Sequence, residues 1–139
     1  MKLIKTMTSI KSSWASEVLL DSLEEKNEKI REMIIQELGG RTGLNLELVC
    51  GKLSHPLWYV KSSALKILGL QKNPSVLIHI EGMLAEPNVD VRRAAAFALG
   101  SIGGNKSLAI LLKLAKDENR FVRSSVEEAM QHLSKLRIT

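Results

Sequence analysis

The chain has 139 residues, about the length of one domain. Hydrophobic residues make up 45% and charged residues 25%, which excludes a disordered chain. Aromatic residues make up only 4%, so the core must be aliphatic, which favours packed helices over a β-sandwich. A single cysteine excludes an internal disulfide framework, and no uncharged stretch is long enough to span a membrane.

The positive charge is spread along the chain. Twenty Lys and Arg against 15 Asp and Glu give a formal net charge of +5. Residues 1–70 carry 10 basic and 8 acidic residues, and residues 71–139 carry 10 and 7. Nucleic-acid-binding proteins usually concentrate basic residues in one patch. Nucleic acid is therefore a weakly supported partner.

The N-terminal segment carries lysines and has no acidic residue before Glu17. It lacks arginine, and Lys5 interrupts the apolar run that a secretory signal needs, so we expect a cytoplasmic protein. Residues 1–12 align with the later part of a repeat described below and predict a partial leading repeat. Because solenoid ends need capping, this N-terminal face either associates with another copy or continues into further sequence.

The rest of the chain repeats with a period of 30 or 31 residues. A β-branched residue followed by a basic one recurs at Ile30-Arg31, Val60-Lys61, Val91-Arg92 and Val122-Arg123. Apolar or small residues recur eight positions after each β-branched residue, and seven and eleven positions before it. A period of this length predicts one helix pair per repeat, and the pairs must stack to bury their apolar faces.

Each repeat reads as two helices joined by a turn. After the β-branched residue, small and apolar residues follow a helical spacing, as in Val91, Ala94, Ala95, Ala98 and Leu99. The preceding segments show the same period, and turn-forming residues separate the two helices. Glycine-rich stretches at 39–43 and 100–104 are predicted to end second helices in a left-handed C-cap. The predicted repeats are approximately 13–40, 44–70, 75–103 and 106–136.

The pattern resembles the HEAT-repeat family, in particular the short HEAT-like repeats of the phycobilisome lyases. The best matches run from Glu86 to Gly100 and from Asp117 to Met130. The resemblance implies one all-α domain over residues 1–139, a right-handed α-α superhelix (HEAT-like solenoid) of about four helix pairs plus the N-terminal half repeat. It also implies a protein-binding scaffold, since such repeats serve mostly in that role.

One column of basic residues has two interpretations. It consists of Arg31, Lys61, Arg92 and Arg123, and six residues before each stand Glu25, His55, Glu86 and Asp117. Four cations in register could bind phosphates. An acid at the inter-helix turn can also accept hydrogen bonds from helix amides and from an arginine of its own or the adjacent repeat. The family resemblance favours this structural role, so we expect a structural ladder.

The candidate binding surface lies on the second helices, which line the concave face of HEAT-like solenoids. The residues predicted to point into it are Phe97, Arg93, Lys66, Ser62, Gln36, Glu32 and Glu128. Aromatic and arginine side chains are typical anchors of binding surfaces. Phe97 could instead lean back over its alanine-rich helix. The turn aromatics Trp58, Tyr59 and Phe121 form a second candidate rim, or pack against helix ends.

No catalytic, metal or cofactor motif is present in the sequence. Cys50 lies among apolar residues and is expected to be a buried structural thiol, and the three histidines are isolated from one another. We therefore expect a non-enzymatic protein-protein interaction scaffold or adaptor, with no cofactor and no membrane contact. Two alternatives remain: nucleic-acid binding through a basic groove, and a bilin-lyase-like protein that handles a chromophore.

Overall fold

The computed structural model describes residues 13–138, which are helical with no strand among them. The α-helices of this part are α2 (Ser13–Asp21), α3 (Glu28–Gly39), α4 (Leu46–Gly51), α5 (Trp58–Gln71), α6 (Leu77–Glu81), α7 (Val89–Ile102), α8 (Gly104–Leu111) and α9 (Arg120–Ile138). Short 3₁₀ helices adjoin the first helices of the repeats: η1 (Ser22–Glu24), η2 (Lys52–Ser54), η3 (Pro74–Val76) and η4 (Leu112–Leu114).

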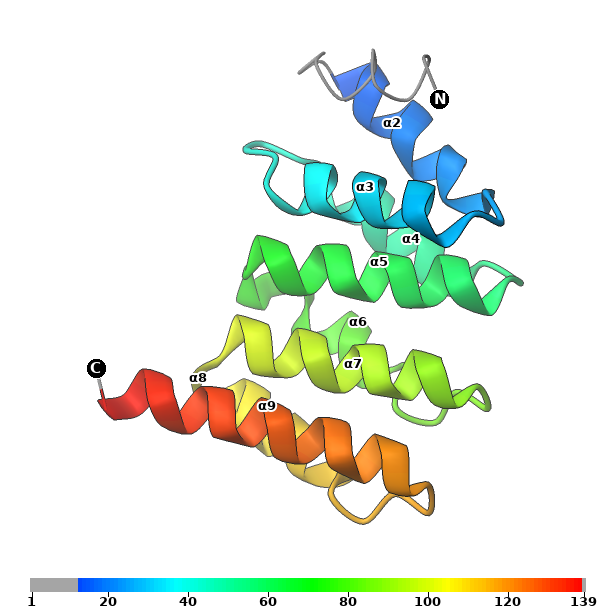
Figure 1. The fold of residues 1–139 in the computed structure, drawn as a ribbon. Coiled ribbons are helices and arrows are strands. Elements are labelled where there is room, and N and C mark those ends of the chain that lie inside the picture. The colour runs from blue at the N-terminus through cyan, green and yellow to red at the C-terminus, as the bar shows by residue number, and fades with distance from the viewer. Residues whose placement is uncertain (1–12, 139) are drawn as a thin grey trace.

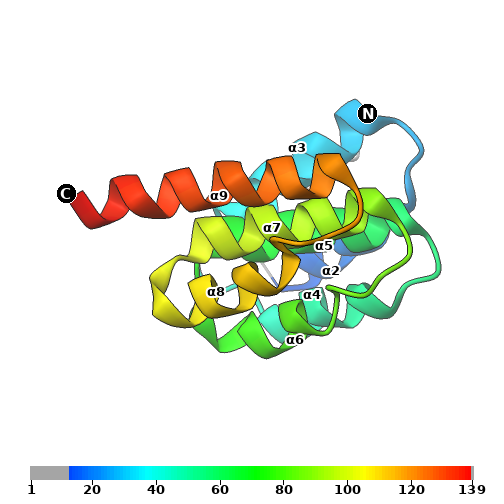
Figure 2. The ribbon, with the colours of Figure 1, turned by 90° about the horizontal axis from the view of Figure 1, so that it is seen from below.

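The helices form two layers. The second helices α3, α5, α7 and α9 stack one below another, and the first helices α4, α6 and α8 lie behind them (Figure 1). The view from below shows the same two layers edge-on, with the C-terminal part of α9 extending beyond the stack (Figure 2). Four helix pairs are thus present in residues 13–138, as an α-solenoid requires. The predicted half repeat at residues 1–12 lies outside the described residues.

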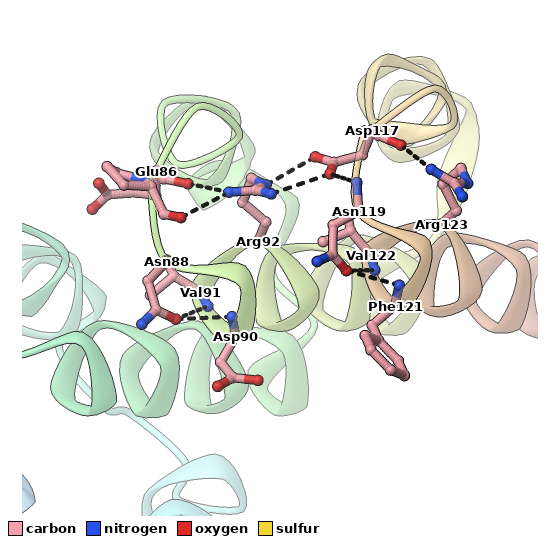
Figure 3. Close-up of polar contacts among 11 residues, drawn as sticks. Glu86, Asn88, Asp90, Val91, Arg92, Asp117, Asn119, Phe121, Val122 and Arg123 are labelled. Atoms are coloured by element: carbon pink, nitrogen blue, oxygen red, sulfur yellow. Dashed lines mark hydrogen bonds and ion pairs between the residues drawn. The ribbon is translucent and has the colours of Figure 1, made fainter.

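Asparagine caps start most of the second helices. The Asn88 side chain accepts hydrogen bonds from the amides of Asp90 and Val91, at 2.8 and 3.2 Å (Figure 3). Asn27 and Asn119 cap α3 and α9 in the same way. These bonds satisfy helix amides that have no partner within the helix, which fixes where each second helix begins.

The apolar positions that recur in every repeat of the chain form the core. The β-branched residues of the last three repeats are buried, and so are the leucines eight positions later, Leu68 and Leu99. The first helices contribute Leu19, Val49, Ile80 and Leu111, all with 0% exposure. Each side chain of this size stabilises the fold by about 1.5–3 kcal/mol when fully buried. The repeating apolar columns therefore hold the two layers together.

The glycine-rich stretches at 39–43 and 100–104 were predicted to end second helices, and α3 and α7 do end within them, at Gly39 and Ile102. Gly69 and Gly100 lie inside helices, and both are buried, as is Gly39. A Cβ at Gly69 would lie 2.9 Å from the Cα of Ala98, so glycine permits α5 and α7 to approach closely. The predicted left-handed αL caps do not form: Gly103 after α7 has a positive φ of 75° but a ψ of −177°, and Gly40 after α3 has φ −94°.

This packing predicts that Gly69→Ala destabilises the protein. The added methyl group would press on Ala98, and overpacking of this kind outweighs the better helix propensity of alanine, for a net loss of about 1–2 kcal/mol. Gly51→Ala is the matched control, since a Cβ there meets nothing within 4 Å and φ is −58°. It should stabilise by about 0.5–1 kcal/mol. Urea unfolding followed by circular dichroism measures both, and equal effects would contradict the packing role.

Candidate functional site

The layer of second helices carries a groove of about 440 Å³, lined by residues of α3, α5, α7 and α9. The structure brings six of the seven predicted surface residues to its wall: Glu32, Ser62, Lys66, Arg93, Phe97 and Glu128. Gln36 does not line it, and its amide donates to Glu32 Oε1 at 3.0 Å. A second hollow of about 350 Å³ shares Arg93, Phe97 and Glu128, so the groove continues toward the C-terminal ends of the helices.

Ser62 differs from the expectation that it faces the partner. It is only 6% exposed, and its hydroxyl donates to the Tyr59 carbonyl oxygen at 3.3 Å. It forms part of the groove floor and offers little surface. In α9 the groove-lining serine is Ser125, one residue after the position that the repeat spacing indicates.

Phe97 combines the two roles that the sequence left open. Its ring is 44% exposed within the groove. One edge of the ring lies against α5, where Cε2 is 3.1 Å from the position of a Cβ at Gly69. Because Gly69 has no side chain, one edge of the Phe97 ring packs against α5 at this position, and the rest of the ring remains accessible.

Arg93 is held in place beside Phe97. Its Nε donates to Ser125 Oγ at 2.9 Å, and its guanidinium carbon lies 5.8 Å from the centre of the Phe121 ring. These contacts bridge α7 and α9. The guanidinium is thus positioned before any partner arrives, which lowers the entropic cost of binding.

Of the three aromatic residues at the turns, Tyr59 packs within the fold, whereas Trp58 and Phe121 remain partly exposed. Tyr59 donates its hydroxyl to the Glu24 carbonyl oxygen at 3.2 Å, and Arg31 lies 4.5 Å from its ring centre. Trp58 packs edge-on against Tyr59 but remains 44% exposed, and Phe121 is 49% exposed. Trp58 and Tyr59 line the groove, whereas Phe121 lies beside it under Arg93.

The basic column and the acids form a ladder at the N-terminal ends of the second helices (Figure 3). Arg92 donates from Nε and Nη2 to the two carboxylate oxygens of Asp117 in the next repeat, at 2.8 and 3.1 Å. Its Nη1 donates to the carbonyl oxygens of Glu86 and Pro87 in its own turn. Lys61 pairs in the same direction with the Glu86 carboxylate. Lys61 and Arg92 thus each tie their own repeat to the next.

The two ends of the ladder use other partners. Arg31 donates to the carbonyl oxygens of Glu25 and Lys26 and stacks on Tyr59. Arg123 donates to the Asp117 carbonyl oxygen at 2.6 Å. All four members of the basic column therefore have contacts within the fold.

The electrostatics of Asp117 follow from the ladder. Burial alone would raise its pKa, but hydrogen bonds from Arg92 and the Asn119 amide, with the charges of Arg92 and Arg123, lower the pKa below its ordinary value. At Cys50, burial and then the nearby Glu47 raise the pKa of the thiol. The thiolate is the reactive form, so Cys50 is poorly suited to nucleophilic chemistry.

Two features of other protein classes are absent from residues 13–138. No cluster of three or more His, Cys, Asp or Glu side chains there could hold a metal ion. Among the helices described, none has the length and apolar character needed to cross a bilayer.

Comparison with known proteins agrees with the fold. The model of the HEAT-repeat family matches residues 46–131, so the chain belongs to the HEAT-repeat family. No curated protein shows a significant match. Human deoxyhypusine hydroxylase, solved in complex with glycerol, has a similar structure with a TM-score of 0.68 and 23% identity. The match covers 86% of this chain and 43% of the hydroxylase.

An engineered protein is also similar, with a TM-score of 0.58 and 14% identity over 95% of this chain and 67% of the engineered one. At these identities both similarities show the fold alone. Together with the family match, they establish a HEAT-repeat α-solenoid.

The ladder predicts a pH-dependent loss of stability in Asp117→Asn. Near pH 6 the free energy of unfolding of the variant should be about 2 kcal/mol lower than that of the wild type. The reason is that Arg92 keeps a buried charge without its ionised partner. The folded-state pKa of Asp117 lies below its unfolded value of about 3.9. The contribution of Asp117 to stability is therefore fully present above the unfolded-state pKa and is lost as pH falls through the folded-state pKa.

Urea unfolding at about pH 6 and about pH 3 tests this, and the gap between wild type and Asp117→Asn should shrink at the lower pH. Glu118→Gln provides a control one residue away, at an exposed side chain. An unchanged gap at both pH values would contradict the proposed role of the ion pair.

Proposed function

We propose that this chain is a non-enzymatic protein-binding scaffold, and that its groove holds a segment of a partner protein. The observation that carries the proposal is the accessible Phe97 ring in the groove, with Arg93 fixed beside it. Binding hot spots are enriched in aromatic and arginine side chains that are surrounded by weaker contacts. Lys66, Glu32 and Glu128 supply such polar surroundings here.

The arrangement of charges favours a protein over a nucleic acid. A nucleic-acid groove needs several basic side chains that are available to phosphates. Lys61 and Arg92 are instead paired with carboxylates, and Arg31 and Arg123 donate to backbone carbonyl oxygens. Carboxylates also line the groove beside its cations.

The enzymatic alternatives gain no support from particular residues. The similarity to the human hydroxylase concerns the fold, and the resemblance to phycobilisome lyases transfers no catalytic residue to this chain. We therefore propose a role without a cofactor. We propose the cytoplasm as the compartment. The chain has one cysteine and so forms no internal disulfide, which is typical of proteins in a reducing compartment.

The proposal predicts that Arg93→Glu/Phe97→Ala abolishes partner capture without unfolding the protein. Immobilised wild type and variant are incubated with lysate of the source organism, with and without nuclease, and bound proteins are identified by mass spectrometry. Both side chains are exposed, so helicity and melting should change little.

Ile78→Ala/Lys106→Glu is the matched control. It makes one apolar truncation and one charge reversal at exposed residues of the first-helix layer. A protein retained by wild type and control, lost with the groove variant and insensitive to nuclease supports the proposal. Retention by the groove variant, or loss on nuclease treatment, contradicts it.

A further inference from the structure

The helix α5 begins differently from the other second helices. The side chains of Asn27, Asn88 and Asn119 accept hydrogen bonds from the first amides of α3, α7 and α9. The residue at this position before α5 is Leu57, which has no side-chain acceptor to offer. The start of α5 therefore depends on another contact.

The imidazole of His55 supplies that contact. Its Nδ1 atom lies 3.1 Å from the amide nitrogen of Leu57, and its Nε2 atom lies 2.7 Å from Glu24 Oε1. A backbone amide can only donate, and an ionised carboxylate can only accept. Nδ1 must therefore be unprotonated and Nε2 must carry the proton, which defines the neutral imidazole in a single tautomer.

Two other repeats use a carboxylate for the same task. Glu25 Oε1 accepts from the Asn27 amide at 3.2 Å, and Asp117 Oδ1 accepts from the Asn119 amide at 2.9 Å. Carboxylates in general stay ionised down to about pH 4, whereas imidazoles gain a proton between about pH 8 and pH 5. A protonated imidazole has no free Nδ1 lone pair, so the contact made by His55 is the one that acid of this strength removes.

We propose that His55 is a pH switch at the start of α5, and that its protonation releases the Leu57 amide and loosens the first turn of the helix. Trp58 and Tyr59 occupy this turn and line the groove. The Tyr59 hydroxyl also donates to the carbonyl oxygen of Glu24, so the same corner joins the aromatic wall to the partner of His55. Acidification therefore changes the shape of the groove, whatever segment the groove binds.

The charged and titratable groups around this imidazole come from η1, η2, α3 and α5. Glu24 of η1 accepts from Nε2 in both protonation states, and its side chain is 61% exposed, so solvent screens most of the added attraction. Arg31 of α3 lies 4.5 Å from the ring centre of Tyr59 and brings a like charge to the same corner. Lys52 of η2 is paired with Asp21. A cation here also meets the positive end of the α5 dipole, so protonation removes one hydrogen bond and gains little in return.

The first test follows the imidazole and the Leu57 amide by NMR in the full chain. At about pH 7.5 the spectrum of the ring nitrogens should place the proton of His55 on Nε2. At about pH 5.5 the exchange protection of the Leu57 amide, measured against an unstructured peptide at the same pH, should fall about fivefold. A loss of this size corresponds to one hydrogen bond of ordinary strength.

The second test follows the aromatic wall in a Trp14→Phe background, where tryptophan fluorescence reports Trp58 alone. The emission should change between about pH 7.5 and about pH 5.5. The informative variant is His55→Asn, which does not titrate. Asn45 and Asn73 already accept from the amide two residues later, so asparagine can take over the bond to Leu57.

His55→Asn should hold both the Leu57 protection and the Trp58 emission nearly constant, within about twofold for the protection. His55→Asp, which places a carboxylate where other repeats have one, is a second variant with an acceptor at both pH values. The matched control is His79→Gln, which removes an exposed imidazole from α6 and should respond as the wild type does.

Three results would each overturn the inference. They are a proton on Nδ1 at about pH 7.5, unchanged protection of the Leu57 amide at about pH 5.5, or the same pH response in wild type and in both His55 variants. All are measured without a binding partner, so they are separate from failure of the proposed function.

Discussion

Helices α5, α7 and α9 approach one another closely at two glycines, and the geometry of the groove depends on this contact. Gly69 faces the backbone of Ala98, and Gly100 faces Ala129 in the next repeat. A larger residue at either glycine would separate the helices or tilt them. The same contact seats the Phe97 ring over Gly69, so the close packing positions the side chain on which the proposed function rests.

The ladder fixes the register of this stack at the other end of the helices. Arg92 spans two repeats, with its guanidinium donating to carbonyl oxygens of its own turn and to Asp117 of the next. A bidentate contact of this kind constrains both distance and orientation. Its side chain is 9% exposed and that of Asp117 is 10% exposed, so solvent screens the pair little. The glycine contacts and the ladder together hold the second helices whose side chains line the groove.

The repeat spacing was sufficient to predict the fold and to bring six of the seven predicted surface residues to the groove, since it tells which helix positions share a face. It could not distinguish Ser62, at the groove floor, from Lys66, one turn later, because exposure depends on how closely α3, α5 and α7 approach. It also missed the packing role of Gly69 and Gly100, since a glycine near a helix end suits a C-cap as well as a close contact. The buried Arg41, whose Nη1 donates to Ser16 Oγ at 3.1 Å, gave no repeating signal, because the corresponding positions of the later repeats hold Gln71, Ile102 and Leu133.

The net charge of the chain is a poor guide to what the groove can bind. Much of the basic excess is used inside the fold, in the ladder and in contacts such as Arg31 with Tyr59 and Arg93 with Ser125. Lys61 and Arg92 face carboxylates, so their fields are largely neutralised at short range, whereas the neutral partners of Arg31 and Arg93 leave those charges in place. The groove lining accordingly carries both signs, with four carboxylates beside three cations. A basic chain can therefore present a groove of mixed charge, because part of its basic excess pairs with carboxylates between its repeats.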